Sequence, residues 1–124
     1  MGAGIQIPSN SSRILLEWGL GPYFEGNVVE PDGITFRRWQ NGSAIGFTKL
    51  IPDFRAKYQA PYYVIHRAHF HDALHRRALD LGIEVKTAHR VVAFGDEEAY
   101  VMCEDGTKIY GDLIVAADGK PFLH

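Results

Sequence analysis

An apolar run near the end of the sequence constrains the fold more than any other segment. Residues 113–117, LIVAA, carry no polar side chain. A short apolar run bounded by turn residues is typical of a buried β-strand. Gly111 precedes the run, and Asp118-Gly119, a turn signal, follows it. We therefore expect a chain that folds around a β-sheet.

Other strands are expected on both sides of this pattern. Residues 34–39 and 44–51 are rich in β-branched and aromatic residues, and Asn41-Gly42 between them is a strong hairpin signal. The polar, proline-flanked stretch 52–61 is expected to be a connecting loop. The remaining predicted strands are 28–29, 83–85, 90–94, 99–104 and 107–110.

One main helix is predicted over 67–81, ended by Gly82. A shorter helix is expected over 13–18, after a cluster of N-cap residues. The order of elements predicts an α+β (α/β-derived) fold, a β-rich layer with one main and one short helix, in a single domain over 1–124. The predicted apolar face of the main helix consists of Phe70, Leu74, Ala78 and Leu81.

Composition excludes several classes of partner. Hydrophobic residues make up 46% and charged residues 23% of the chain, as in ordinary globular proteins. A net charge of −2 gives no electrostatic reason to expect nucleic acid or an anionic membrane. Cys103 is the single cysteine, so we expect a packed thiol and no intrachain disulfide. No run is long enough to cross a bilayer, and we expect a soluble, cytoplasmic protein.

Three segments carry a resemblance to a known family. They are GAGIQIPSN at 2–10, YYVIHR at 62–67 and GDLIVAADG at 111–119. Together and in this order they resemble the FAD-dependent aromatic hydroxylases of the salicylate and para-hydroxybenzoate hydroxylase group. The resemblance covers essentially the whole chain and implies a fold related to the central part of those proteins.

The resemblance also implies which residues would contact FAD. In the family the glycine-rich turn lies beside the flavin, since glycine lets the backbone approach a flat ring. An arginine that opens the helix contacts the phosphate and ribityl region, and Arg67 holds that position here. The residues implied to bind the cofactor are Gly2, Gly4, Arg67, Val92 and Asp118.

The sequence departs from the family at its cofactor loops. The strand, Gly-x-Gly-x-x-Gly loop and helix that hold the pyrophosphate are not found, nor is the acidic residue that holds the ribose. The serine and arginine that usually follow the Asp-Gly pair are replaced by KPFLH at 120–124. We interpret the chain as a truncated internal segment, and we expect no tightly bound cofactor on the isolated chain.

A cluster of titratable side chains offers acid–base chemistry. A histidine beside a carboxylate suits proton transfer near neutral pH, and the candidate catalytic residues are His66, His69, His71 and Asp72. His71 and His75 share a helical face, but no third ligand is evident, so we expect a solvated surface and no metal site. Asp72 and Arg76 are expected to form a surface ion pair.

Two further clusters leave alternatives open. Arg37, Arg38 and Trp39 are suited to an anionic or aromatic ligand, but alternation along a strand favours one arginine in solvent and Trp39 in the core. Tyr62 and Tyr63 point in opposite directions for the same reason. One of them is expected in the core, and the other is free to donate its hydroxyl to a ligand.

Three hypotheses for function follow. The first is a truncated flavin monooxygenase-like protein of small-molecule secondary metabolism that catalyses a cofactor-free isomerisation or cyclisation of a small hydrophobic or aromatic molecule. The second is an FAD-dependent monooxygenase whose cofactor site is completed by another chain or by a homodimer partner. The third is a non-catalytic fragment or interaction module, for which an exposed sheet edge makes a dimer plausible.

Overall fold

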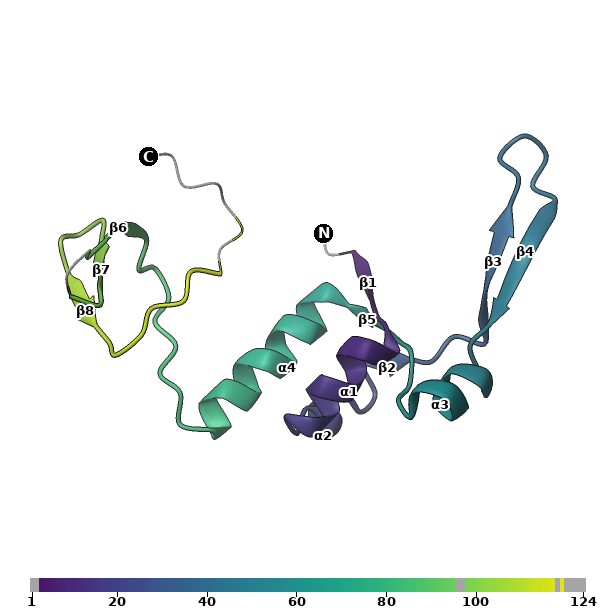
Figure 1. Cartoon of the computed structure of the whole chain (residues 1–124), viewed down its shortest axis with the longest axis horizontal. Helices are drawn as coiled ribbons and strands as arrows, with labels where there is room; N and C mark the ends of the chain where they lie inside the picture. The colour runs from purple at the N-terminus through teal and green to yellow at the C-terminus, as the bar shows by residue number, and fades with distance from the viewer. Residues whose placement is uncertain (1–2, 96–97, 118, 120–124) are drawn as a thin grey trace. The chain divides into compact units, whose positions relative to one another are not determined.

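The computed structural model describes residues 3–95, 98–117 and 119, and the chain divides into two units, Met1–Val85 and Lys86–His124. The chain contains both helices and antiparallel strands, so the predicted α+β class is confirmed (Figure 1). The prediction of a single domain over 1–124 stays a prediction. The first unit contains β1 (Gly4–Ile7), α1 (Ser9–Glu17), α2 (Gly21–Phe24), β2 (Val28–Val29), β3 (Gly33–Arg37), β4 (Ala44–Lys49), α3 (Asp53–Tyr58), β5 (Tyr63–His66) and α4 (Arg67–Asp80).

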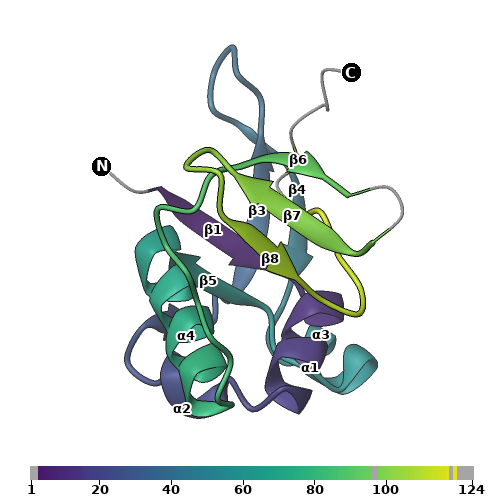
Figure 2. The ribbon, with the colours of Figure 1, turned by 90° about the vertical axis from the view of Figure 1, so that its left-hand side faces the viewer.

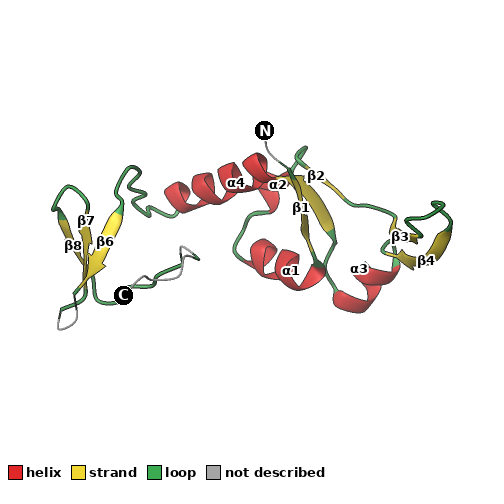
Figure 3. Ribbon diagram, turned by 90° about the horizontal axis from the view of Figure 1, so that it is seen from above, coloured by secondary structure: helices red, strands yellow, loops and turns green. Residues whose placement is uncertain are grey.

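The core of the first unit lies between a small sheet and three helices. Strand β5 is central and pairs antiparallel with β1 on one side and β2 on the other. Figure 3 shows α1, α2 and α4 beside these strands. Aliphatic and aromatic burial of this kind is the main favourable contribution to folding. The buried cluster consists of Ile7, Leu15, Leu20, Phe24, Ile65 and Ala73.

Helix α4 confirms the predicted main helix but turns a different face inward. Ala73 is buried and Phe70 packs against the core, whereas Leu74 and Leu81 are 37% and 56% exposed. The inward stripe therefore follows the spacing of three residues from Phe70 to Ala73, because α4 packs onto α2. The predicted face is wrong at Leu74 and Leu81.

Two short helices were not expected from the sequence. The proposed loop over 52–61 is wrong, since Asp53–Tyr58 forms α3. Asp53 in its first turn and Arg55 and Lys57 in its last turn complement the helix dipole. Helix α2 begins at Gly21 and has Pro22 in its first turn. A proline is tolerated there because the N–H that it lacks would have no partner within the helix.

Strands β3 and β4 form the predicted hairpin. Its turn contains Gly42 in the left-handed region, with φ 71°, which glycine adopts without steric cost. Phe47 lies over Gly33, where a side chain would collide with the ring. Trp39 is 89% exposed, so its predicted place in the core is wrong.

The second unit is a three-stranded antiparallel sheet of β6 (Val91–Phe94), β7 (Tyr100–Cys103) and β8 (Lys108–Tyr110), seen in Figure 2. Cys103 is buried, as predicted. The strands predicted at 83–85 and 113–117 are absent among the residues that the structure describes. Leu113 and Val115 are 80% and 77% exposed because no described strand pairs with this segment.

The described part of the chain contains neither a membrane-spanning helix nor a metal-binding cluster. No helix there is long and apolar enough to cross a membrane. No group of three or more metal-ligating side chains lies close enough there to hold an ion, including the histidines of α4.

Candidate functional site

Pairing of β1 with β5 brings together two segments that lie some sixty residues apart in the sequence. Gly4 stands opposite His66 in the antiparallel register, and Ile5 stands opposite Ile65. The N–H of Arg67 donates a hydrogen bond of 3.1 Å to the carbonyl of Ala3. The glycine-rich segment and the arginine that opens α4 therefore meet at one end of the sheet. We call this end, defined by Gly4, His66 and Arg67, the β1–β5 edge.

The start of α4 is built to receive negative charge. His66 is its N-cap, and its Nδ1 accepts a hydrogen bond of 3.3 Å from the N–H of Ala68. The helix runs for 14 residues, so its first turn carries the positive end of a helix dipole. Arg67 adds a full positive charge there and is exposed. Such an arrangement suits a phosphate or carboxylate group.

Gly4 has no steric reason to be glycine within the described chain. It is exposed and is not among the glycines with positive φ. A side chain built on it would meet nothing closer than the carbonyl of Ile65, at 4.0 Å. The bare backbone instead leaves an open surface on which a flat group can lie in contact.

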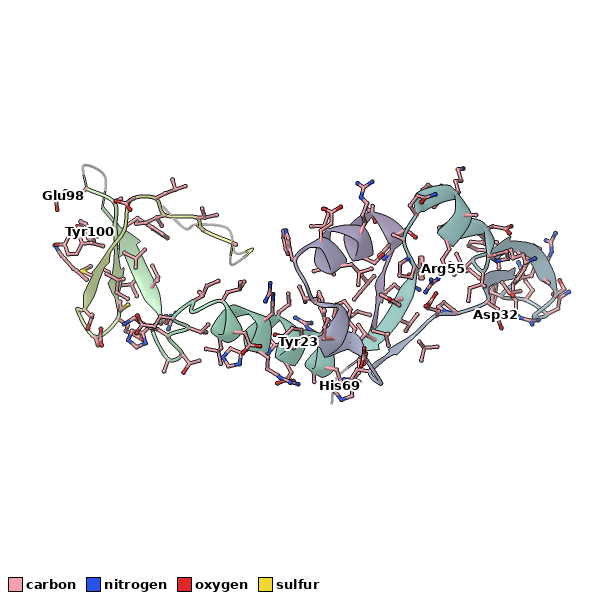
Figure 4. All side chains as sticks on the ribbon, turned by 90° about the horizontal axis from the view of Figure 1, so that it is seen from below. Tyr23, Asp32, Arg55, His69, Glu98 and Tyr100 are labelled. Atoms are coloured by element: carbon pink, nitrogen blue, oxygen red, sulfur yellow. The ribbon has the colours of Figure 1, made fainter. Side chains whose placement is uncertain are left out.

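The candidate catalytic residues separate into two groups. His66 and His69 lie at the β1–β5 edge, with ring centroids 5.5 Å apart, and His69 is labelled in Figure 4. His71 stacks on His75 with centroids 6.5 Å apart, and Asp72 forms a 3.8 Å ion pair with Arg76. His71 and Asp72 are exposed on the solvent side of α4, and the surface pair expected for Asp72 is confirmed.

Three other residues are implied to bind the cofactor, namely Gly2, Val92 and Asp118. Val92 lies on β6 in the second unit and is 52% exposed. Gly2 and Asp118 lie outside the described residues. The β1–β5 edge thus unites Gly4 and Arg67 of the predicted cofactor set with two of the predicted histidines.

A polar cluster that the sequence did not indicate lies behind β5. Arg55, labelled in Figure 4, forms a two-pronged ion pair with Glu30, in which its Nε lies 2.7 Å from Oε2. Burial raises the pKa of the Tyr63 hydroxyl, and the Glu30 carboxylate raises it further, while Arg55 opposes the shift. The dipole-matched charges of α3 are the signal that would have revealed this helix and its arginine.

Of the adjacent tyrosines Tyr62 and Tyr63, one is in the core, as predicted. Tyr62 is buried, and its hydroxyl donates a hydrogen bond of 2.6 Å to Oε1 of Gln6 on β1. Tyr63 is half-buried and packs edge-on against Phe24, with centroids 5.9 Å apart. The Tyr62 bond ties β1 to the segment that leads into β5.

Comparison with known proteins gives a consistent result over nearly the whole chain. No family model matches the sequence. The chain is 37% identical to the 3-amino-4-hydroxybenzoate 2-monooxygenase PtmB3 of Streptomyces platensis, with 95% of this chain and 30% of that protein aligned. It is 32% identical to 3-hydroxybenzoate 6-hydroxylase 1 of Aquipseudomonas alcaligenes, with 96% and 31% aligned. The FAD-dependent monooxygenase OpS4 of Beauveria bassiana is 30% identical, with 96% and 28% aligned.

Over nearly its whole length, the chain is homologous to a segment of FAD-dependent monooxygenases. The predicted family is therefore confirmed. This monooxygenase segment spans about 30% of the length of the curated relatives that it matches.

Solved structures agree with the fold of the monooxygenase segment. The tetrameric form of 2-methyl-3-hydroxypyridine-5-carboxylic acid oxygenase matches it with a TM-score of 0.76 and 26% identity, over 96% of this chain and 29% of that one. Klebsiella pneumoniae HpxO, complexed with FAD and uric acid, matches with a TM-score of 0.74 and 21% identity, over 96% and 30%. The latter likeness concerns the fold alone.

Proposed function

We propose that this chain forms part of the flavin site of an FAD-dependent monooxygenase that acts on a small aromatic molecule. The observation that carries the proposal is the pairing of β1 with β5, which sets the bare backbone at Gly4 beside Arg67. Relatives whose names specify a hydroxybenzoate support the class of substrate. The pyrophosphate loop lies outside this sequence, so the complete site includes further polypeptide. The predicted cytoplasmic location stays a prediction.

The residues present fit one part of FAD. Gly4 offers an exposed backbone without a side chain for contact with the flat ring. Arg67 and the first turn of α4 would hold the phosphate and ribityl end through charge. Bound flavin supplies the redox chemistry by which such enzymes activate oxygen. His66 contributes by capping α4, so that the helix start keeps its position beside β1.

The proposal is tested by titrating the isotopically labelled chain with FAD and following its backbone amides by NMR. Since only part of the site is present, we expect a dissociation constant weaker than about 10 μM. Shifts are expected at Gly4, Ile5 and Arg67. The substitution Arg67→Gln should weaken binding about tenfold or more, because a hydrogen bond to a charged group contributes about 1.5–3 kcal/mol.

Arg76→Gln is the matched control for this titration. It removes the same charge from the same helix, at an exposed residue paired only with Asp72 among the ion pairs that the structure describes. We expect FAD to bind this variant as it binds the unmodified chain. Shifts that avoid both Gly4 and Arg67, or equal losses in the two variants, would contradict the proposal.

A cofactor-free isomerisation or cyclisation is the second candidate. The observation in its favour is the exposed His66–His69 pair, whose rings lie 5.5 Å apart at the same edge. His71 and Asp72 make their contacts elsewhere on α4. His66 and His69 are therefore the best acid–base groups for such a reaction. Single substitutions His66→Gln and His69→Gln should then each reduce turnover of the substrate without flavin. Full activity in both variants would reject this candidate.

A further inference from the structure

Helices α1 and α3 enclose a groove on the first unit that the flavin proposal does not use. Two adjoining hollows form it, of about 310 Å³ and about 230 Å³. Ser9, Asn10 and Tyr58 line both hollows. We call this surface the α1–α3 groove. Figures 1 and 3 show the two helices side by side, as their contacts require.

The N-terminus of α1, at one wall of the groove, has no capping side chain. Its N-cap is Pro8, which makes no side-chain hydrogen bond. No described group accepts a hydrogen bond from the N–H of Ser9 or Asn10, the first two residues of the helix. Unsatisfied N–H groups and the positive end of the helix dipole both favour an anion there.

Ser9 supplies a second and independent indication of a ligand. Its side chain is 4% exposed, yet its Oγ has no hydrogen-bond partner among the described residues. Ser12, one turn later and fully buried, donates its hydroxyl hydrogen bond to the carbonyl of Pro61. Buried hydroxyls in native proteins are normally satisfied. An orphan hydroxyl in the wall of both hollows points to a partner that enters the groove.

The larger hollow carries two positive charges. Arg13 of α1 and Lys57 of α3 line it, together with the amide of Gln59. Neither cation forms an ion pair with a described residue. Lys57 instead lies over the ring of Tyr58, with its Nζ 5.2 Å from the centroid. Two cations without an ion pair among the described residues, beside a bare helix N-terminus, suit a carboxylate.

The smaller hollow has an apolar lining. Pro8, Phe54 and Tyr58 form its walls, and the two rings pack edge-on with centroids 5.0 Å apart. A ligand that fills both hollows needs an apolar body and an anionic head. This division of chemistry is typical of small-molecule sites, in which apolar walls give affinity and a few polar groups fix orientation.

We infer that the α1–α3 groove binds a small organic carboxylate, with its head on Ser9, Arg13 and Lys57 and its apolar body against Phe54 and Tyr58. The groove is linked to the β1–β5 edge through packed side chains. Phe54 contacts Tyr62, with centroids 6.1 Å apart, and Tyr62 donates its hydroxyl hydrogen bond to Gln6 on β1. Phe54 and Tyr62 therefore connect the groove to β1, the strand that carries Gly4.

Three probes of matched chemistry test the inference by NMR titration of the labelled chain. Hexanoate carries both the apolar body and the carboxylate, 1-hexanol has only the body, and acetate has only the head. We expect hexanoate to shift the amides of Ser9, Asn10 and Tyr58, and to bind at least about tenfold more tightly than either other probe. Equal affinity for hexanoate and hexanol would overturn the anionic head, and equal affinity for hexanoate and acetate would overturn the apolar body.

Substitutions then locate the site. Arg13→Gln and Lys57→Gln should each weaken hexanoate binding about tenfold, whereas Arg38→Gln and Lys49→Gln remove the same charges from the exposed hairpin and should leave it unchanged. An equal loss of hexanoate affinity in the groove and hairpin variants would overturn the assignment of the site to the groove.

Ser9→Ala separates a binding role from a structural one. Removal of a buried, unpartnered hydroxyl should leave the melting temperature of the free chain unchanged or higher, yet weaken hexanoate several-fold. The exposed neighbour gives the control Ser11→Ala, which should change neither quantity. A Ser9→Ala chain that binds hexanoate normally would overturn the role of this hydroxyl, whatever its stability.

Discussion

The β1–β5–β2 sheet and the β3–β4 hairpin contain similar residues but differ in what covers them. Ile7 and Ile65 of the sheet are 3% and 2% exposed, since α1, α2 and α4 cover their side of it. Phe36 and Phe47 of the hairpin are 54% and 62% exposed. Both regions are paired antiparallel, and the hairpin has a register shift between Phe36 and Arg37.

The difference shows that strand pairing and burial are separate properties of this chain. A two-stranded hairpin is marginally stable by itself, because each strand has one paired edge and no packed face. The sheet gains its stability from the helices that exclude water from one face. We therefore expect the global stability of the first unit to depend on the helix-covered sheet and to be nearly independent of the hairpin.

Truncation of one aromatic ring in each region should give the largest contrast. Phe24 is 2% exposed and lies edge-on to Tyr63 and tilted against Phe70. Phe24→Ala should lower the free energy of unfolding by about 3–5 kcal/mol, the usual cost for a buried ring. Phe47 is the exposed counterpart in the hairpin. Phe47→Ala should lower the free energy of unfolding by about 0.5 kcal/mol, as at other surface positions. Urea unfolding followed by circular dichroism measures both.

Phe24→Leu keeps this comparison usable where the alanine variant is too unstable to fold. The leucine retains part of the apolar volume and should fall between the two other variants. Equal losses for Phe24→Leu and Phe47→Ala would show that the hairpin belongs to the cooperative core, against our distinction.

Arg55→Gln tests the connection between the two regions. Glu30 follows β2 and Arg55 lies on α3, so their ion pair joins the segments on either side of the hairpin. Their side chains are 26% and 55% exposed, and a pair of this exposure contributes at most about 1 kcal/mol. The pKa of Tyr63 should rise further, because the variant removes the one cation that opposes the shift and leaves Glu30 in place.

The measurements for Arg55→Gln are urea unfolding and a spectroscopic titration of tyrosinate. Arg90→Gln, which breaks an exposed pair in the second unit, is the control and should change neither. A Tyr63 pKa that falls in Arg55→Gln would contradict the assigned charge arrangement.

The elements predicted correctly from the sequence are those with local signals. Asn41-Gly42 determines a turn by backbone conformation alone, and the 67–81 pattern determines a helix by its period. Burial was predicted less well, because it depends on which other segment covers a side chain. Trp39 and the 113–117 run are apolar yet exposed, since no described segment covers them.

The candidate site shows the same division. Family resemblance placed Gly4 and Arg67 together, although no local pattern required β1 to pair with β5. The contacts of Arg55 and one wall of the α1–α3 groove depend on α3, which the flanking prolines concealed as an apparent loop. A proline before a helix is compatible with helix formation, so Pro52 did not exclude a helix over 53–58.

The smallest expected effect concerns α2 and α4, two of the helices that cover the sheet. The Tyr23 hydroxyl donates a hydrogen bond to the Asp80 carboxylate, and this bond raises the pKa of Tyr23 above its ordinary value. The folded chain then holds the Tyr23 proton more tightly than the unfolded chain. The contribution to stability is fully present below about pH 10 and is lost as the pH rises above the unfolded pKa.

Tyr23→Phe should therefore flatten the decrease in stability above about pH 10 and change little at neutral pH, since the ring that packs against the core is kept. Asp80→Asn should flatten it in the same way, because it removes the charge that disfavours ionisation of Tyr23. Thermal unfolding across this pH range measures the slope, and Tyr63 keeps its own contribution in both variants. An unchanged slope in Tyr23→Phe would mean that the α2–α4 hydrogen bond does not form in solution, and the two helices would then be joined without it.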